Sequence, residues 1–238
     1  MQVPRPSDYL PHLAYDSVVF GFAGEQLRIL ILEYRNTGYH ALPGGFVGRD
    51  ENLDEAVRRG LRERTGLDNL HLQQFHTFGS TRRHQPEVMR TILSANGFPV
   101  DQAEWMLDRF ITVGYYSLIN YHLVTPRPDA LSDSLKWYAI DELPPLLWDH
   151  REMVDKALYT LRRNLDTMLI GTNMLPERFT IKQLQQVTEA ILGEKLHRTS
   201  FQRRMLSSGN LLRHEKLYTG GSHKAPYLYS FVTAGEGD

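Results

Sequence analysis

The sequence lacks cysteine altogether, although it is 238 residues long. Without thiols the chain has no disulfide, no cysteine-based zinc or iron–sulfur site, and no cysteine nucleophile. It also lacks any run of about 18 apolar residues, so no transmembrane helix and no membrane partner are expected. Residues 1–15 lack the apolar segment of a signal peptide. These absences favour a protein of the cytoplasm.

The sequence also has little net charge, but the charge is unevenly distributed. The whole chain carries −1, whereas residues 1–171 carry −4 and residues 172–238 carry +3. Residues 195–225 alone carry +6. An acidic larger part joined to a basic smaller part predicts two domains with different partners. A hydrophobic content of 41% provides material for a sizeable core.

The larger part has the pattern of an α+β or mixed α/β domain. Asn52 and Glu55 form a capping box at the start of a predicted helix, and Gly66 is placed to end it. A hairpin is expected around Gly24-Glu25. The expected strands cover residues 16–22, 27–34, 70–78, 110–124 and 136–140, and the expected helices cover 52–65, 149–164 and one or two short segments in 86–108. We therefore expect a first domain over residues 1–150 and a linking helix with a connector over 151–172.

Residues 173–238 have a different pattern. Capping boxes at Thr180 and Thr199 each start a predicted helix, and Gly193 and Gly209 are placed to end these helices. Two strand-like segments follow, joined by a polar loop that contains two glycines. Helix, helix and hairpin with a basic tip is the order of a winged helix-turn-helix domain.

The second of these helices is the candidate recognition helix. On a helical wheel Phe201, Met205 and Leu206 share one arc, which predicts a buried face. The opposite face combines arginines, which bind guanine or phosphate through two hydrogen bonds, with short polar residues. The candidate DNA-binding residues are Lys195, Arg198, Thr199, Ser200, Arg203, Arg204, Ser207, His223 and Lys224. A solvated basic face without DNA is the alternative.

The segment from Gly45 to Leu67 resembles a Nudix box. The family pattern is Gly, five residues, Glu, seven residues, then R-E-U-x-E-E-x-G-U, where U is aliphatic. Seven fixed positions match it: Gly45, Glu51, Arg59, Leu61, Glu63, Gly66 and Leu67. The resemblance implies a Nudix-like α/β/α sandwich in the first domain.

Two departures from this pattern affect the chemistry. Gly60 and Arg64 stand where the family has glutamates that, with the carboxylate at position 63, bind magnesium or manganese. Glycine offers no ligand, and a guanidinium repels a cation by roughly 4 kcal/mol per unit charge at ~4 Å. We therefore expect a degenerate box without a catalytic or metal site, in which Glu51, Arg59 and Glu63 pair with one another. The alternative is a magnesium-dependent Nudix hydrolase of nucleoside diphosphates with an accessory winged helix.

A degenerate Nudix domain followed by a winged helix resembles the bacterial Nudix-related transcriptional regulators. The resemblance covers nearly the whole chain, from Gly44-Gly45-Phe46-Val47 to the closing Tyr227-Leu-Tyr-Ser-Phe231. It implies a homodimer that binds double-stranded operator DNA and senses a small-molecule effector, with no cofactor. A winged helix that binds protein in place of DNA is a weaker alternative.

Residues 86–108 look like an insertion relative to the NAD-linked members of that family. Phe98, Trp105 and Met106 within it are placed to cover the ligand pocket or a dimer interface. The insertion favours a sugar or sugar derivative as effector and leaves an ADP-ribose-like nucleotide second. The candidate effector-binding residues are Tyr34, Arg35, Tyr39, Arg82, Arg83 and Trp105, each with core packing or solvent exposure as its alternative.

Overall fold

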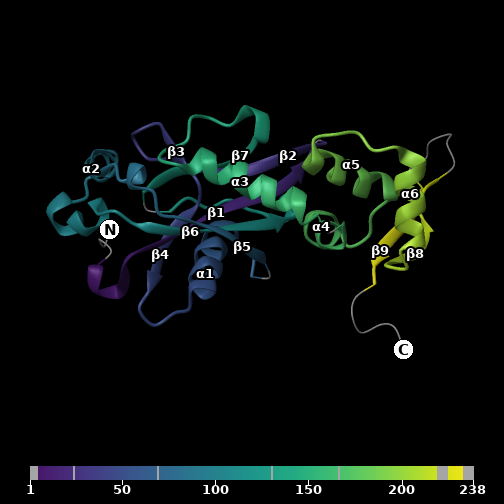
Figure 1. Ribbon diagram of the computed structural model, residues 1–238, viewed down its shortest axis with the longest axis horizontal. Coiled ribbons are helices and arrows are strands. Elements are labelled where there is room, and N and C mark those ends of the chain that lie inside the picture. The colour runs from purple at the N-terminus through teal and green to yellow at the C-terminus, as the bar shows by residue number, and fades with distance from the viewer. Residues whose placement is uncertain are drawn as a thin grey trace.

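The computed structural model describes residues 5–23, 25–68, 70–129, 131–165, 167–218 and 225–232. It has a large part built on a mixed sheet and a small helical part at the C-terminal end (Figure 1). The strands are β1 (Tyr9–Ala23), β2 (Gln26–Tyr34), β3 (Tyr39–Ala41), β4 (Gly44–Gly48), β5 (His71–Phe78), β6 (Ile111–Ile119), β7 (Ser132–Ala139), β8 (Leu211–Lys216) and β9 (Tyr227–Phe231). The α-helices are α1 (Leu53–Thr65), α2 (Pro86–Ala95), α3 (His150–Arg163), α4 (Thr167–Met174), α5 (Ile181–Leu192) and α6 (Arg198–Ser207).

The large sheet is organised around β1. Its strand order is β3-β2-β1-β6-β5, with β4 paired to β1 and β7 paired to β2. Strands β1 and β6 run parallel, in register from Leu13 opposite Ile111 to Gly21 opposite Ile119. This pairing brings together segments that are about a hundred residues apart in the chain, and it sets the position of the pocket described below.

Both faces of this sheet are covered by a helix, which explains the long apolar run in β1. Val19 packs in one core cluster with Val57 and Leu61 of α1. Val18, on the opposite face, packs in another cluster with Met153 of α3. The mixed α/β class and the expected sandwich of a sheet between helices are therefore confirmed.

The small C-terminal part consists of α5, α6, β8 and β9, in the order of a winged helix, and is called the winged helix below. It shares a core with the large sheet. The cluster that contains Val18 and Met153 continues through Val187 of α5 and Phe201 of α6 to Phe231 of β9. Helix α3 also contacts α5 directly. The two parts are thus packed together as well as linked by the chain. In the described residues, no helix is long and apolar enough to cross a membrane.

Local signals in the sequence account for several helix ends. The Glu55 carboxylate accepts a hydrogen bond from the Asn52 backbone N–H at 2.8 Å, as the capping box requires. Thr180 Oγ1 accepts from the Gln183 N–H at 3.2 Å. Gly66 and Gly193 end α1 and α5 with φ of 75° and 76°, a left-handed conformation that suits glycine.

Other local expectations are wrong. Helix α6 begins at Arg198 with His197 as its N-cap, so the capping box at Thr199 does not form. Leu206 is 46% exposed, and the buried residues of α6 are Phe201 and Met205. By contrast, the one or two short helices expected in residues 86–108 are present, as α2 and a 3-10 helix, η3 (Val100–Leu107).

Candidate ligand pocket and nucleic-acid interface

A cavity of about 340 Å³ lies where β1, β4 and α1 meet the insertion. Its wall includes charged side chains: Asp16, Arg59, Glu63, Arg64, Arg83, Asp108 and Asp129. It also includes apolar side chains, largely supplied by the insertion and its neighbours: Phe46, Met89, Leu93, Phe98, Met106, Leu107 and Phe110. Such a combination of a flat apolar surface and a few polar groups is typical of small-molecule sites.

Helix α1 brings Arg59, Glu63 and Arg64 of the box to this cavity. Arg59 donates two hydrogen bonds to the Glu51 carboxylate, at 2.7 and 3.0 Å, and a third to the Phe46 carbonyl at 3.3 Å. This contact from Arg59 lowers the pKa of Glu51. Glu63 lies 3.8 Å from the same guanidinium. The expected pairing of these three residues is therefore present, and it ties the loop after β4 to α1.

A tyrosine and an arginine fill the place of the two missing glutamates. A Cβ atom at position 60 would lie 2.0 Å from Tyr15 Oη, so only glycine fits beneath this phenol. Burial raises the pKa of Tyr15, which keeps the phenol neutral. Arg64 donates hydrogen bonds to the Gly60 carbonyl at 3.1 Å, the Gly44 carbonyl at 2.9 Å and Asp129 Oδ2 at 2.8 Å. Burial alone would raise the pKa of Asp129, but Arg64 and nearby donors hold it below its ordinary value.

These residues do not provide a divalent-cation site. Gly60 has no donor atom, Arg64 is a cation, and Glu51 is bound by Arg59. Across the described part of the chain, no three His, Cys, Asp or Glu side chains are grouped so that they could hold a metal ion. A hard cation such as magnesium requires several oxygen ligands, which this donor set does not supply.

A buried charge cluster forms part of the cavity wall. Arg83 approaches Asp16 at 3.5 Å and Asp149 at 3.3 Å. His150 Nδ1 accepts a hydrogen bond from the Leu42 N–H at 2.9 Å, which places the ring proton on Nε2, 3.6 Å from Asp16. Burial lowers the pKa of His150, so the ring is neutral. The cluster joins β1 to the start of α3.

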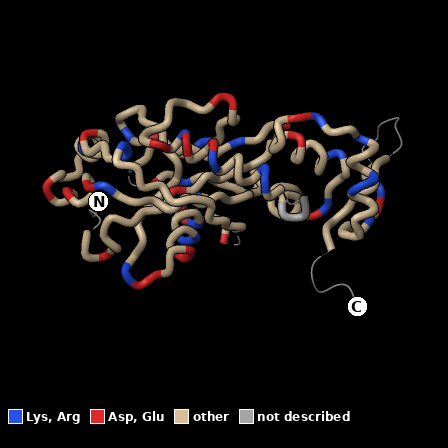
Figure 2. The backbone as a smooth tube through the Cα atoms, in the orientation of Figure 1, with Lys and Arg blue, Asp and Glu red and all other residues tan. Residues whose placement is uncertain are grey.

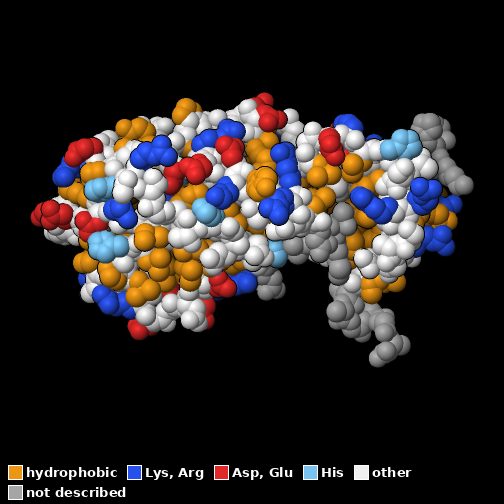
Figure 3. Space-filling model, viewed as in Figure 1, with side chains coloured by type: hydrophobic (Ala, Val, Ile, Leu, Met, Phe, Trp, Pro, Cys, Tyr) orange, Lys and Arg blue, Asp and Glu red, His pale blue; other side chains and the backbone are white. Residues whose placement is uncertain are grey.

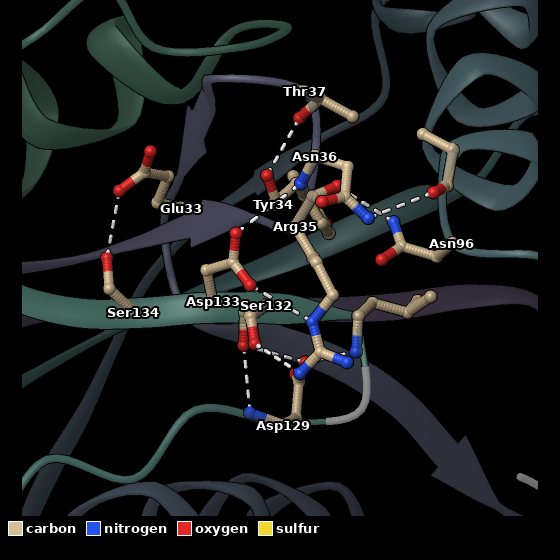
Figure 4. A network of polar contacts seen from close by, with 12 residues as sticks. Glu33, Tyr34, Arg35, Asn36, Thr37, Asn96, Asp129, Ser132, Asp133 and Ser134 are labelled. Atoms are coloured by element: carbon tan, nitrogen blue, oxygen red, sulfur yellow. Dashed lines mark hydrogen bonds and ion pairs between the residues drawn. The ribbon is translucent and has the colours of Figure 1, made fainter.

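The structure places the predicted effector-binding residues in two groups. Tyr34 and Arg83 line the cavity. Arg35, Tyr39, Arg82 and Trp105 lie outside its wall. Arg35 binds Asp133 at 3.0 Å, and neighbouring Asn36 binds the Ala95 carbonyl of α2 (Figure 4), so this segment anchors the insertion.

Trp105 has an indirect relation to the cavity. Its ring stacks on Tyr9 at 5.8 Å and lies 4.7 Å from the ring of Phe46. Tyr9 and Phe46 both line the cavity, so Trp105 supports the wall from behind. Phe98 and Met106, which the sequence placed over the pocket, are part of the wall itself.

Sequence reasoning missed many of the lining residues, and three of them hold the charged part of the wall: Asp16, Tyr15 and Asp129. Asp16 carried a signal, because it is an acidic residue at the entrance of an apolar run. Tyr15 and Asp129 carried none, since an aromatic residue in a strand and an acid in a loop are common. Their roles depend on contacts with Gly60 and Arg64 that only the folded chain creates.

The second candidate site is the outer face of α6. Phe201 and Met205 are buried, whereas the polar and basic residues of the helix are exposed. Several Lys and Arg positions lie along the chain at this end of the molecule (Figure 2), and their side chains are on its surface (Figure 3). The Arg204 guanidinium lies over the Phe201 ring at 5.5 Å. Exposed in this region are Lys195, Arg198, Thr199, Ser200, Arg203, Arg204 and Ser207.

Some members of the predicted DNA-binding set have internal partners. Lys195 pairs with the buried Glu189 carboxylate at 3.0 Å, which neutralises part of its charge. The Ser207 hydroxyl donates to the Arg204 carbonyl at 3.2 Å. His223 and Lys224, placed by sequence at the wing tip, lie outside the described residues.

This fold and these two sites define a class of protein: a Nudix-type domain with an altered metal site, joined to a winged helix. Residues 10–157 match the model of the NUDIX domain, and residues 171–231 match that of the NrtR DNA-binding winged helix domain. The chain therefore belongs to the Nudix family, and it carries a C-terminal winged helix of the NrtR type.

Three known proteins are similar to this chain over most of its length. A protein of Acinetobacter baylyi named "ADPR responsive transcriptional repressor NtrR" is 29% identical over 96% of this chain and 85% of its own length. The crystal structure of Shewanella oneidensis NrtR with a 27mer DNA is 27% identical, covers 92% of this chain and 93% of its own, and has a TM-score of 0.71. A MutT/nudix family protein from Enterococcus faecalis, at 19% identity and a TM-score of 0.66, shows the fold alone.

Proposed function

We propose that this protein is a DNA-binding transcriptional repressor whose Nudix domain binds an ADP-ribose-like nucleotide as effector. The exposed basic face of α6 carries the DNA-binding part of this proposal. The Acinetobacter baylyi relative, a repressor that responds to ADPR, supports both parts over nearly the full chain. The sugar effector, which the insertion favoured, has no comparable support, and the nucleotide takes its place.

The cavity is chemically suited to a nucleoside diphosphate ligand. Its wall offers arginines for phosphate oxygens, and its apolar side chains, with Phe46, Phe98 and Phe110, offer aromatic surfaces for a base. Tyr34 and Arg83 remain in the proposed effector-binding set.

A winged helix of this kind places its second helix in the major groove, and a symmetric dimer would present two such helices to two half-sites. We propose that this protein acts as a homodimer on operator DNA in the cytoplasm. We keep the expected boundaries at residues 150 and 172. They separate the ligand-binding domain, the linking helix with its connector, and the DNA-binding winged helix.

The proposal is tested on DNA from upstream of the protein's own gene and of its neighbours. Arg203→Ala should weaken operator binding by about 1–3 kcal/mol and relax specificity at one base pair, because Arg203 is exposed on α6. Fluorescence anisotropy over a series of salt concentrations measures this. Arg90→Ala removes the same charge from α2, far from α6, and is the matched control. Equal affinity of the Arg203→Ala variant and the unaltered protein would show that α6 does not read DNA.

A further inference from the structure

Helix α1 presents to the cavity a different set of groups from the one that the Nudix pattern requires. The Nudix pattern places a divalent cation against the glutamates of this helix, and the donors present here do not fit one. Two groups stand there instead: the neutral phenol of Tyr15, which closes over Gly60, and the guanidinium of Arg64.

Arg64 is largely buried and is held in place by three hydrogen bonds. Its side chain is 13% exposed, and two backbone carbonyls and the Asp129 carboxylate fix it between 2.8 and 3.1 Å. These three bonds use three of the five N–H donors of a guanidinium. The residue lines the cavity, so a ligand in the cavity meets a fixed positive charge.

We propose that Arg64 replaces the divalent cation of the Nudix site and binds the diphosphate of the effector directly, so that effector binding needs no metal. This inference rests on the proposed function, because it assumes a nucleoside diphosphate ligand. A planar guanidinium suits it, since two parallel N–H donors match two phosphate oxygens. Nη2 of Arg64 already donates to both the Gly44 carbonyl and Asp129. For a two-point contact, the diphosphate would therefore displace the Asp129 carboxylate from Nη2.

The test measures ADP-ribose binding by isothermal titration calorimetry, with excess magnesium in one series and excess EDTA in the other. For the unaltered protein, the two dissociation constants should agree within about twofold. Arg64→Gln should weaken binding about tenfold or more, because it removes a charge-assisted, two-point contact. Arg64→Lys, which keeps the charge and loses the fork, should fall between them.

Arg62→Gln is the matched control. Arg62 lies on the same helix, pairs with Asp68 at 3.6 Å, and its side chain is 60% exposed. Its variant should bind within about twofold of the unaltered protein. Circular dichroism of each variant checks that the overall secondary structure is unchanged. The comparison of magnesium with EDTA uses the unaltered chain, so it holds even if a variant does not fold.

The outcomes separate this inference from the proposed function. Binding that requires magnesium, or an Arg64→Gln variant that binds like the unaltered protein, overturns the role of Arg64 and leaves the effector in place. A protein that binds no ADP-ribose in either series overturns the proposed effector, and the role of Arg64 with it.

Discussion

At position 60, the preference for glycine is set by a residue that is distant in the sequence, Tyr15. Glycine inside a helix normally costs about 0.5–1 kcal/mol relative to alanine. At this position a Cβ atom would lie 2.0 Å from Tyr15 Oη and 3.1 Å from its Cζ. Tyr15 is 2% exposed, so its ring has little room to move. The close packing of β1 on α1 therefore reverses the usual preference.

We expect Gly60→Ala to lower the free energy of unfolding by roughly 1–3 kcal/mol, the cost of overpacking, instead of raising it. Chemical denaturation measures the change. Tyr15→Phe in the same chain should recover part of the loss, because it removes the atom that clashes most. If Gly60→Ala stabilises the protein, Tyr15 does not occupy this space.

Among the elements, α3 depends on the buried cluster at its first turn. His150 is its first residue, and the neighbouring Asp149 contacts Arg83 at 3.3 Å. Around the imidazole lie Asp16, Arg83 and Asp149, and burial outweighs the two carboxylates in lowering its pKa from 6.5. A histidine with a lowered pKa in the folded state contributes its full stability above about pH 6.5, and loses it as the pH falls.

His150→Asn should therefore make stability less dependent on pH between about 7 and 5. The amide oxygen can accept from the Leu42 N–H as Nδ1 does, but it does not titrate. Each unit of pKa difference corresponds to about 1.4 kcal/mol. Urea denaturation at several pH values measures this slope. His71 and His76, whose pKa values are also lowered by burial, are present in both proteins and cancel in the comparison. An unchanged slope would contradict a neutral, buried His150.

For the whole molecule, the decisive feature is the core that joins the sheet to the winged helix. Val187 of α5 belongs to the same cluster as Met153 of α3, and Arg162 of α3 donates to the Ile191 carbonyl of α5 at 2.7 Å. His150, the first residue of α3, lines the cavity, so these contacts connect the cavity through α3 to the winged helix. They offer a physical route by which ligand and DNA could influence each other.

We expect the large part and the winged helix to unfold in one cooperative transition, because they share this core. All three tryptophans, at positions 105, 137 and 148, precede α3, so tryptophan fluorescence reports on the large part alone, whereas far-UV circular dichroism reports on both. The two melting curves should coincide, and Val187→Ala should lower both midpoints together. Separate transitions would contradict a shared core.

Features that depend only on neighbouring residues could be predicted from the sequence. Capping at Asn52 and Thr180, left-handed glycines at 66 and 193, and the order of helices and hairpin in the winged helix all follow from local chemistry. The loss of metal ligands at positions 60 and 64 was also legible, because it is a matter of residue type.

Which residues line the pocket, and how the large part packs against the winged helix, became clear only from the tertiary structure. The parallel pairing of β1 with β6, the Tyr15 phenol over Gly60 and the contact of Arg64 with Asp129 each unite residues far apart in the chain. The helical wheel of α6 placed Leu206 on the buried face, but the side chain is exposed, because burial depends on what packs against a helix. Local patterns set which elements form, whereas the close packing of distant side chains sets which groups face a ligand.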